Sequence, residues 1–238
     1  MDPRLTTLEM SPPAGESSDL SAIVRQSLEL ALAGTSKVSP EILDIPGMSG
    51  RRYRYFINNL MERLAAPRYL EIGSWAGSTL CSALYGNKVD AVAVDNWSLF
   101  GGPADQFFTN LAAFKGASTV SFLEKDFRAI DFTTFGATFG KFNVYLFDGP
   151  HDFIDQYDGV MLAQPVLEQR NIQIVDDWNW SAVREGTQKA IADLGLRTEF
   201  RTEIRTSMDE TAPEPPPGGH KNSDWHNGYF IAVLSRPS

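Results

Sequence analysis

The sequence predicts an α/β fold in which a doubly wound, mostly parallel sheet is followed by an antiparallel strand pair. Short apolar segments alternate with helical segments over residues 67–194, and parallel strands need such crossover helices. Beyond them, LRTEFRTEIRT alternates polar and apolar residues, and the chain ends in the apolar run YFIAVLS. With 42% hydrophobic residues, the 238-residue chain can bury the core of one such domain.

The N-terminal part precedes this alternation. Residues 1–19 are rich in Pro, Ser, Gly and acidic residues and lack an apolar period, which is typical of a mobile tail. Residues 20–33 and 51–65 place apolar side chains at helical spacing. We therefore expect N-terminal accessory helices within residues 20–66. The apolar face of the first helix can pack on its own domain or on a second subunit, which leaves a homo-oligomer open.

The domain of residues 67–238 is expected to contain five βα units in a row. In chain order these are the strand RYLEI, a helix from Gly77, the strand VDAVAVD, a helix near 106–114, the strand STVSFLEKD with a short connection, the strand FNVYLFD, a helix near 153–164, the strand NIQIVDD and a helix near 182–194. Two final strands are joined by a flexible loop, 207–224. We expect this loop and the N-terminal helices to form a substrate lid.

Charge and cysteine content exclude several function classes. Lys and Arg number 21 against 30 Asp and Glu, and the net charge of −9 opposes sequence-independent nucleic-acid binding. The single cysteine, Cys81, excludes an internal disulfide framework and a Cys-rich zinc site. No signal-peptide pattern and no apolar run of about 18 residues is present. We therefore expect a cytoplasmic protein with neither nucleic acid nor membrane as a partner.

A glycine-rich turn follows the first strand of the domain, with Glu71, Gly73 and Gly77 in a Glu-x-Gly-x-x-x-Gly pattern. Glycines let the backbone pass close to a ligand, and the helix that follows offers free N–H groups. The next strand ends in Asp95, whose carboxylate can accept both hydroxyls of a ribose. Because the Gly-x-Gly-x-x-Gly pattern is missing, a nucleoside with a small charged tail is favoured over a dinucleotide.

The pair YLEIGSWAGST and AVAVDNW, in a βα chain closed by two strands, resembles the class I S-adenosylmethionine-dependent methyltransferases over roughly residues 50–235. The resemblance implies a Rossmann-like fold and S-adenosylmethionine as the cofactor. It implies that Glu71, Gly73 and Gly77 line the methionine and ribose portion, while Asp95 holds the ribose hydroxyls. The full set of cofactor-binding residues that we expect is Glu71, Gly73, Ser74, Trp75, Gly77, Thr79, Asp95, Asn96, Trp97, Asp126, Phe127 and Asp148.

Three members of this set have a second interpretation. The resemblance places Asn96 and Trp97 beside the adenine and Asp126 at a position that often contacts the adenine amino group. Ordinary hydrophobic packing is the alternative for Trp97, as it is for Trp75. For Asp126 the alternative is a cap at the start of the segment FRAIDF.

Acidic residues follow the fourth and fifth strands of the domain. FNVYLF ends in Asp148, with His151 shortly after it, and NIQIV ends in Asp176 and Asp177. In an open α/β sheet, ligands lie outside the carboxyl ends of the strands, so these side chains should converge. Packed carboxylates repel one another unless a cation bridges them, and an all-oxygen set suits Mg²⁺, Mn²⁺ or Ca²⁺. We therefore expect Asp148, Asp176 and Asp177 to form a divalent metal site.

This layout resembles the metal-dependent O-methyltransferases of the catechol and the macrocin or sugar type. In the catechol type a lysine three residues after the first Asp is the general base, and here His151 stands at that position. An imidazole, with an ordinary pKa of about 6.5, suits this task near neutrality. The predicted function is metal-assisted O-methylation of a hydroxyl on a small molecule or sugar, with His151 as the catalytic base.

Other interpretations remain open at this stage. In a metal-independent methyltransferase, His151 would act alone and the aspartates would bind substrate hydroxyls. A nicotinamide-dependent oxidoreductase is a second alternative, opposed by the missing third glycine and the C-terminal strand pair. A protein that binds the cofactor without catalysis is a third. Individually, Asp148 could belong to a Gly-Pro turn and Asp177 could cap the next helix.

Two groups of charged or polar residues receive no chemical role. Arg51, Arg52 and Arg54 begin the second N-terminal helix, where the helix dipole disfavours cations. We interpret them as a solvated face, with recruitment of an acidic substrate or partner as the alternative. Near the C-terminus, we expect His220 to be solvated and His226 to lie at a strand edge.

Overall fold

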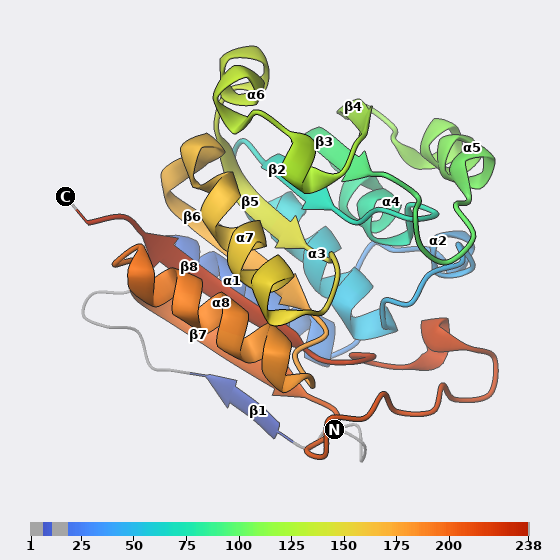
Figure 1. Ribbon diagram of the computed structural model, residues 1–238. Coiled ribbons are helices and arrows are strands. Elements are labelled where there is room, and N and C mark those ends of the chain that lie inside the picture. Colours follow the sequence, from blue (N-terminus) through green and yellow to red (C-terminus); the bar gives the residue numbers. More distant parts are fainter. Residues whose placement is uncertain (1–6, 11–18, 238) are drawn as a thin grey trace.

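An eight-stranded sheet of order β1-β7-β8-β6-β5-β2-β3-β4 forms the centre of the computed structural model, which describes residues 7–10 and 19–237 (Figure 1). The strands are β1 (Thr7–Met10), β2 (Arg68–Ile72), β3 (Asp90–Asp95), β4 (Thr119–Glu124), β5 (Phe142–Phe147), β6 (Leu167–Asp176), β7 (Arg197–Arg205) and β8 (Tyr229–Ser235). Strands β2 to β6 pair in parallel, whereas β8 runs antiparallel to both β6 and β7. The predicted doubly wound, mostly parallel sheet with an antiparallel strand pair is confirmed.

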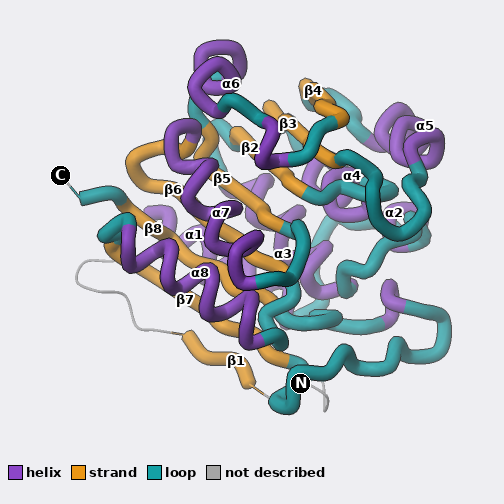
Figure 2. The backbone as a smooth tube through the Cα atoms, viewed as in Figure 1, coloured by secondary structure: helices purple, strands orange, loops and turns teal. Residues whose placement is uncertain are grey.

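Helices cover both faces of the sheet (Figure 2). The helices are α1 (Asp19–Leu32), α2 (Pro40–Leu43), α3 (Arg51–Arg63), α4 (Ser78–Leu84), α5 (Ala104–Phe114), α6 (Phe132–Phe139), α7 (Phe153–Ala163) and α8 (Ser181–Asp193). Alternate strand residues face opposite layers: in β2, Tyr69 packs with α1, α3 and α4, whereas Leu70 and Ile72 pack with α6 and α7. Within the described ranges, no helix has the length and apolar content needed to cross a membrane.

The N-terminal helices belong to the same core as the sheet. In α1, Val24, Leu28 and Ala31 are buried in a cluster with α3 side chains such as Phe56 and Leu60. The apolar face of α1 therefore packs on its own domain, which was one of the two alternatives in the sequence.

Two segments differ from the sequence prediction. The connection expected after β4 contains α6, where Phe132 and Phe135 are buried and Asp131 caps the helix through the Thr133 N–H at 3.0 Å. The phenylalanines stand at helical spacing, but Gly136 and three threonines lower the helix propensity of this stretch. The predicted tail of residues 1–19 contains β1, an edge strand whose backbone pairs with β7; residues 1–6 and 11–18 lie outside the described residues.

The arginines at the start of α3 do not form a solvated face, so that prediction is wrong. Arg51 Nη2 and Arg52 Nε donate to the carboxylate of Asp224 at 3.1 and 2.8 Å, and Arg54 is fully buried. The backbone N–H of Arg51 donates to the Ser223 carbonyl at 2.7 Å. The unfavourable dipole is offset because the segment before β8 supplies both acceptors and a carboxylate to the helix N-terminus.

Replacing Asp224 by asparagine is expected to lower the free energy of unfolding by about 2 kcal/mol. Asp224 is only 5% exposed, and its loss leaves Arg51 and Arg52 without their shared carboxylate. Urea unfolding at neutral pH measures the change. The matched control is Asp44→Asn, because the Asp44 carboxylate is exposed and pairs with Lys221 on the surface. Equal losses in the two variants would contradict a structural role for the Asp224 pairs.

Candidate active site

A cavity of about 540 Å³ lies at the carboxyl ends of the parallel strands, where the strand order reverses between β2 and β5. This is the place where open α/β sheets bind ligands. The loops after β2, β3, β4, β5 and β6 all contribute lining residues, together with the segments 47–49 and 212–227. The cavity therefore contains both the glycine-rich turn and the acidic strand ends that the sequence singled out.

The glycine-rich turn is shaped by close backbone contact. Gly73 has φ +88°, and a Cβ at this position would lie 1.8 Å from the carbonyl oxygen of Asp148. Only glycine lets the end of β2 approach the end of β5 this closely. The Trp75 N–H donates to Asp95 Oδ2 at 2.7 Å, and the Trp97 N–H donates to Asp95 Oδ1 at 2.7 Å. The Asp95 carboxylate thus fixes the loops after β2 and β3 to each other at the cavity wall.

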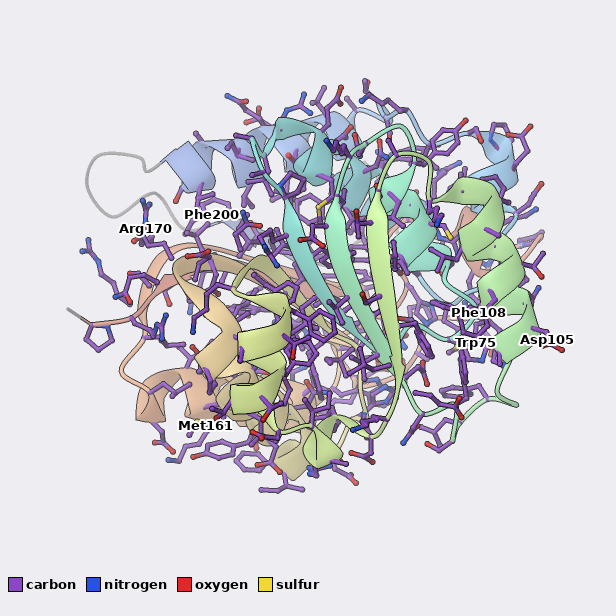
Figure 3. All side chains as sticks on the ribbon, turned by 90° about the horizontal axis from the view of Figure 1, so that it is seen from above. Trp75, Asp105, Phe108, Met161, Arg170 and Phe200 are labelled. Atoms are coloured by element: carbon purple, nitrogen blue, oxygen red, sulfur yellow. The ribbon has the colours of Figure 1, made fainter. Side chains whose placement is uncertain are left out.

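Most of the residues predicted to bind the cofactor line this cavity. They are Gly73, Ser74, Trp75, Thr79, Asp95, Asn96, Asp126, Phe127 and Asp148. Figure 3 shows Trp75 on the side of the molecule where α5 carries Asp105 and Phe108. The Asp126 carboxylate also accepts the Arg128 N–H at 2.9 Å, so its capping role and its place in the cavity coexist.

Three predicted cofactor residues are not among the lining residues: Glu71, Gly77 and Trp97. Trp97 stacks on Phe122 with ring centroids 4.7 Å apart, so its side chain has the packing role that was the alternative. Gly77 has φ +83° and precedes α4 as its N-cap. Glu71 is fully buried beneath the turn and accepts the Tyr69 hydroxyl at 2.6 Å.

The acidic residues after β5 and β6 converge as predicted. Asp148, Asp176 and Asp177 each offer a carboxylate oxygen, and these atoms lie within 4.8 Å of one another. Asp176 accepts the Asp177 N–H at 2.7 Å and the Tyr229 hydroxyl at 3.1 Å. Asp177 accepts the Asn227 side-chain amide at 2.7 Å. Among the described residues, none donates a hydrogen bond to the carboxylate of Asp148.

The electrostatics of this cluster favour a cation. Burial raises the pKa of Asp148, and the charge of Asp177 raises it further. Burial also raises the pKa of Asp176, and the charges of Asp148 and Asp177 add to this effect. Each carboxylate thus disfavours the ionisation of the next, and a bound divalent cation would remove that repulsion. The donor set, which consists only of carboxylate oxygens, fits Mg²⁺, Mn²⁺ or Ca²⁺.

His151 pairs with one of these carboxylates. Its Nε2 lies 2.7 Å from Asp177 Oδ2, and this hydrogen bond raises the pKa of His151. Burial alone would raise the pKa of Asp177, but hydrogen bonds from His151 and Asn227 and the histidine charge lower it overall. Because an ionised carboxylate only accepts, Nε2 carries the proton. In the neutral imidazole, Nδ1 is therefore the atom of His151 that is left to accept a proton.

The cavity contains residues that sequence reasoning missed. His220 and His226 both line it, with their Nδ1 atoms 3.2 Å apart, so all three histidines of the chain meet there. The prediction that His220 is solvated is wrong, since it is half-buried, and His226 is only 9% exposed. His226 and Asp177 adopt left-handed φ values of +44° and +60°. Such strain in non-glycine residues clusters at functional sites.

Comparison with known proteins gives matches among solved structures only. No model of a known protein family and no curated protein matches the sequence. TrmN from Thermus thermophilus matches with TM-score 0.54 and 15% identity. The match covers 83% of this chain but only 52% of TrmN, so the chain spans about half the length of that protein. An O-methyltransferase from Bacillus cereus in complex with SAH matches with TM-score 0.50 and 14% identity, and the match covers 93% of this chain and 94% of that protein.

The O-methyltransferase TomG from Streptomyces achromogenes, in complex with SAM, matches with TM-score 0.51 and 13% identity, and the match covers 92% of this chain and 91% of TomG. At these identities the similarity shows the fold. The chain thus has the fold of the class I S-adenosylmethionine-dependent methyltransferases. The proteins from Bacillus cereus and Streptomyces achromogenes, whose matches cover more than nine-tenths of this chain and of their own chains, are both O-methyltransferases.

Proposed function

We propose that this protein is an S-adenosylmethionine-dependent O-methyltransferase in which Asp148, Asp176 and Asp177 hold a divalent cation. The observation that carries the proposal is the position of the three carboxylates: they converge in the same cavity as the glycine-rich turn and Asp95. The Asp148 carboxylate has no hydrogen-bond donor among the described residues, which supports a cation as its partner. The fold and its O-methyltransferase neighbours support the methyl donor.

Within this proposal, the two halves of the cavity have different tasks. Asp95, Asn96, Asp126 and Phe127 bind the adenosine part of the donor, and the turn around Gly73 lies beside its methionine part. The carboxylates and His151 lie beside the acceptor. A cavity of about 540 Å³ has the size of a typical small-molecule site. We therefore propose a small molecule or a sugar as the acceptor, since the net charge of −9 opposes a polyanion.

His151 is proposed as the general base. Nδ1 accepts the proton of the acceptor hydroxyl, while Asp177 holds the ring through Nε2 and stabilises the imidazolium that forms. When bound, a divalent cation would lower the pKa of an acceptor hydroxyl and orient it. The remaining contribution of the protein is to hold donor and acceptor in line, which is an effect of proximity.

Calorimetric titration tests this function. S-adenosylmethionine and then Mg²⁺ are added to the wild type, to the Asp148→Ala/Asp176→Ala variant and to Asp105→Ala, an exposed aspartate of α5, as the control. We expect the cofactor to bind all three proteins and Mg²⁺ to bind only the wild type and the control. Cofactor binding without a metal site would favour the metal-independent mechanism. Failure of the wild type to bind the cofactor would refute the methyltransferase proposal.

The hydroxyl of Tyr229 is expected to tune the metal site. It donates to Asp176 Oδ2, and Tyr53 stacks on its ring with centroids 3.9 Å apart, which fixes the ring. Partners of ligating carboxylates orient them, so Tyr229→Phe should weaken Mg²⁺ binding about tenfold. The control is Tyr145→Phe, which removes a buried hydroxyl bonded to the Gly159 carbonyl. Unchanged Mg²⁺ affinity in Tyr229→Phe would show that Asp176 needs no such support.

A further inference from the structure

Arg54 is a buried cation that has no anionic partner within the part of the chain that the structure describes. Its side chain is fully buried, and none of the described carboxylates forms an ion pair with it. Arginine is rarely buried unless its charge is paired, because desolvation of an unpaired charge is costly. The structure therefore contains a positive charge beside the cavity that the described residues do not neutralise.

Neutral groups satisfy only part of the guanidinium. Nη1 donates to the carbonyls of Ile42, Leu43 and Ile45 at 3.3, 3.2 and 3.1 Å. These bonds hold the segment after α2 in place and give Arg54 a structural role. Nη2 is buried and has no hydrogen-bond partner in the described ranges 7–10 and 19–237. A Cβ on Gly47, which lines the cavity, would lie 3.1 Å from Nη2 and 2.0 Å from the Ser78 hydroxyl oxygen.

The third donor of Arg54 connects it to the cavity wall. Nε donates to Ser49 Oγ at 3.0 Å, and Ser49 Oγ lies 3.2 Å from Ser78 Oγ. Both serines line the cavity, and both are more than nine-tenths buried. Since one hydroxyl of the pair donates to the other, one O–H remains without an acceptor.

The wall formed by Ser49 and Ser78 therefore offers hydroxyl donors and a positive charge but no carboxylate. The charge reaches the cavity: besides burial, Arg54 lowers the pKa of His220, a lining residue. An excess of donors next to an unpaired arginine is complementary to a carboxylate, which is an acceptor only and carries the opposite charge. The wall adjoins the glycine-rich turn, where the proposed function places the amino-acid end of the methyl donor.

We propose that Ser49 and Ser78 form a subsite for the carboxylate of the methyl donor, with Arg54 as the positioning residue that supplies the charge behind them. The inference rests on the proposed function, since it assigns one functional group of the proposed donor. Arg54 acts through the two serines and the fixed segment 47–49.

The test compares two ligands that differ in this group alone, S-adenosylmethionine and decarboxylated S-adenosylmethionine, by calorimetry without acceptor. The wild type should bind the carboxylated ligand about 10- to 100-fold more tightly. Arg54→Met should lose that preference and retain its affinity for the decarboxylated ligand, and Arg54→Lys should restore part of the preference. Arg236→Met is the control, because Arg236 also donates to a backbone carbonyl, that of Leu167, which begins β6.

A second variant keeps the test decisive if Arg54→Met does not fold. Ser49→Ala/Ser78→Ala removes the hydroxyls and keeps the arginine, and it should also reduce the preference. A preference that survives in the folded variants, or a wild type that binds both ligands equally, would overturn the subsite but leave the proposed function intact. A wild type that binds neither ligand would overturn the proposed function and the subsite with it.

Discussion

Replacing His151 by alanine is expected to lower kcat for methyl transfer by about 10²- to 10⁴-fold. The expectation follows from the pair between His151 Nε2 and Asp177 Oδ2, which leaves Nδ1 free to accept the proton of the acceptor hydroxyl. The His151 side chain is 44% exposed, so its loss should leave the core packing unchanged. The affinity for S-adenosylmethionine should also stay close to that of the wild type. Single-turnover kinetics with a screened hydroxyl acceptor and added Mg²⁺ measure the effect.

Two further measurements separate a base from a residue that only shapes the cavity. Added imidazole should restore part of the activity of His151→Ala, because it can occupy the vacated space and accept the proton. His220→Ala is the matched control, since His220 lines the same cavity but is not paired with Asp148, Asp176 or Asp177. If the two variants lose similar activity and imidazole restores neither, His151 is not the base.

Local sequence patterns predicted most of the fold because the apolar runs in the sequence are the buried strands of the core. Strands β2 and β3 are apolar runs buried on both faces, and glycine turns and helices follow them in the expected order. Helix α6 was missed although Phe132, Phe135 and Phe139 stand at helical spacing, because the threonines and the glycine between them are weak helix formers. Tertiary packing stabilises this helix although its intrinsic propensity is low.

The candidate site was predictable only where it lies on strand ends. Asp148, Asp176 and Asp177 meet because parallel strands end at one edge of the sheet, and that rule can be applied to a sequence. Ser49 and His226 come from segments whose path is set by long-range contacts, such as the pairing of Arg52 with Asp224. No local spacing encodes that contact.

The burial of the arginines at the start of α3 was also not predictable from local sequence. A cation at a helix start is unfavourable when only the helix is considered, so exposure was the natural interpretation. In the folded chain the segment before β8 brings Asp224 and backbone carbonyls to that helix start. The carbonyls that receive Arg54 come from α2 and the loop after it. Burial of these arginines is therefore a property of the tertiary structure.

Replacing Glu71 by glutamine is expected to make the stability of the protein less sensitive to a rise in pH from 5 to 8. Glu71 is fully buried, and burial raises its pKa from an ordinary value of 4.5 to about 7, although hydrogen bonds from the Tyr69 and Ser74 hydroxyls lower it in part. The folded protein therefore prefers the protonated carboxyl, whereas the unfolded chain loses this proton near pH 4.5.

The sign of the pH effect follows from proton binding. Between pH 4.5 and about 7 the folded state binds more protons than the unfolded state, so the free energy of unfolding falls as the pH rises. Glutamine has no proton to lose. Relative to the wild type, Glu71→Gln should therefore gain about 2–3 kcal/mol between pH 5 and pH 8. Urea unfolding in the presence of EDTA at the two pH values measures this gain without a contribution from bound metal.

Comparison with the wild type separates Glu71 from the other buried carboxyls. Burial also raises the pKa values of Asp148 and Asp176. Both residues are present in the variant and in the wild type, so their contributions largely cancel when the two free energies of unfolding are subtracted. Glu124→Gln is the matched control, because this carboxyl at the end of β4 is exposed and is hydrated in both the folded and the unfolded state. If the stability profiles of Glu71→Gln and the wild type ran parallel from pH 5 to pH 8, Glu71 would have to ionise within the folded protein as readily as in water. Its buried position without a cation among its described contacts makes that outcome incompatible with the structure.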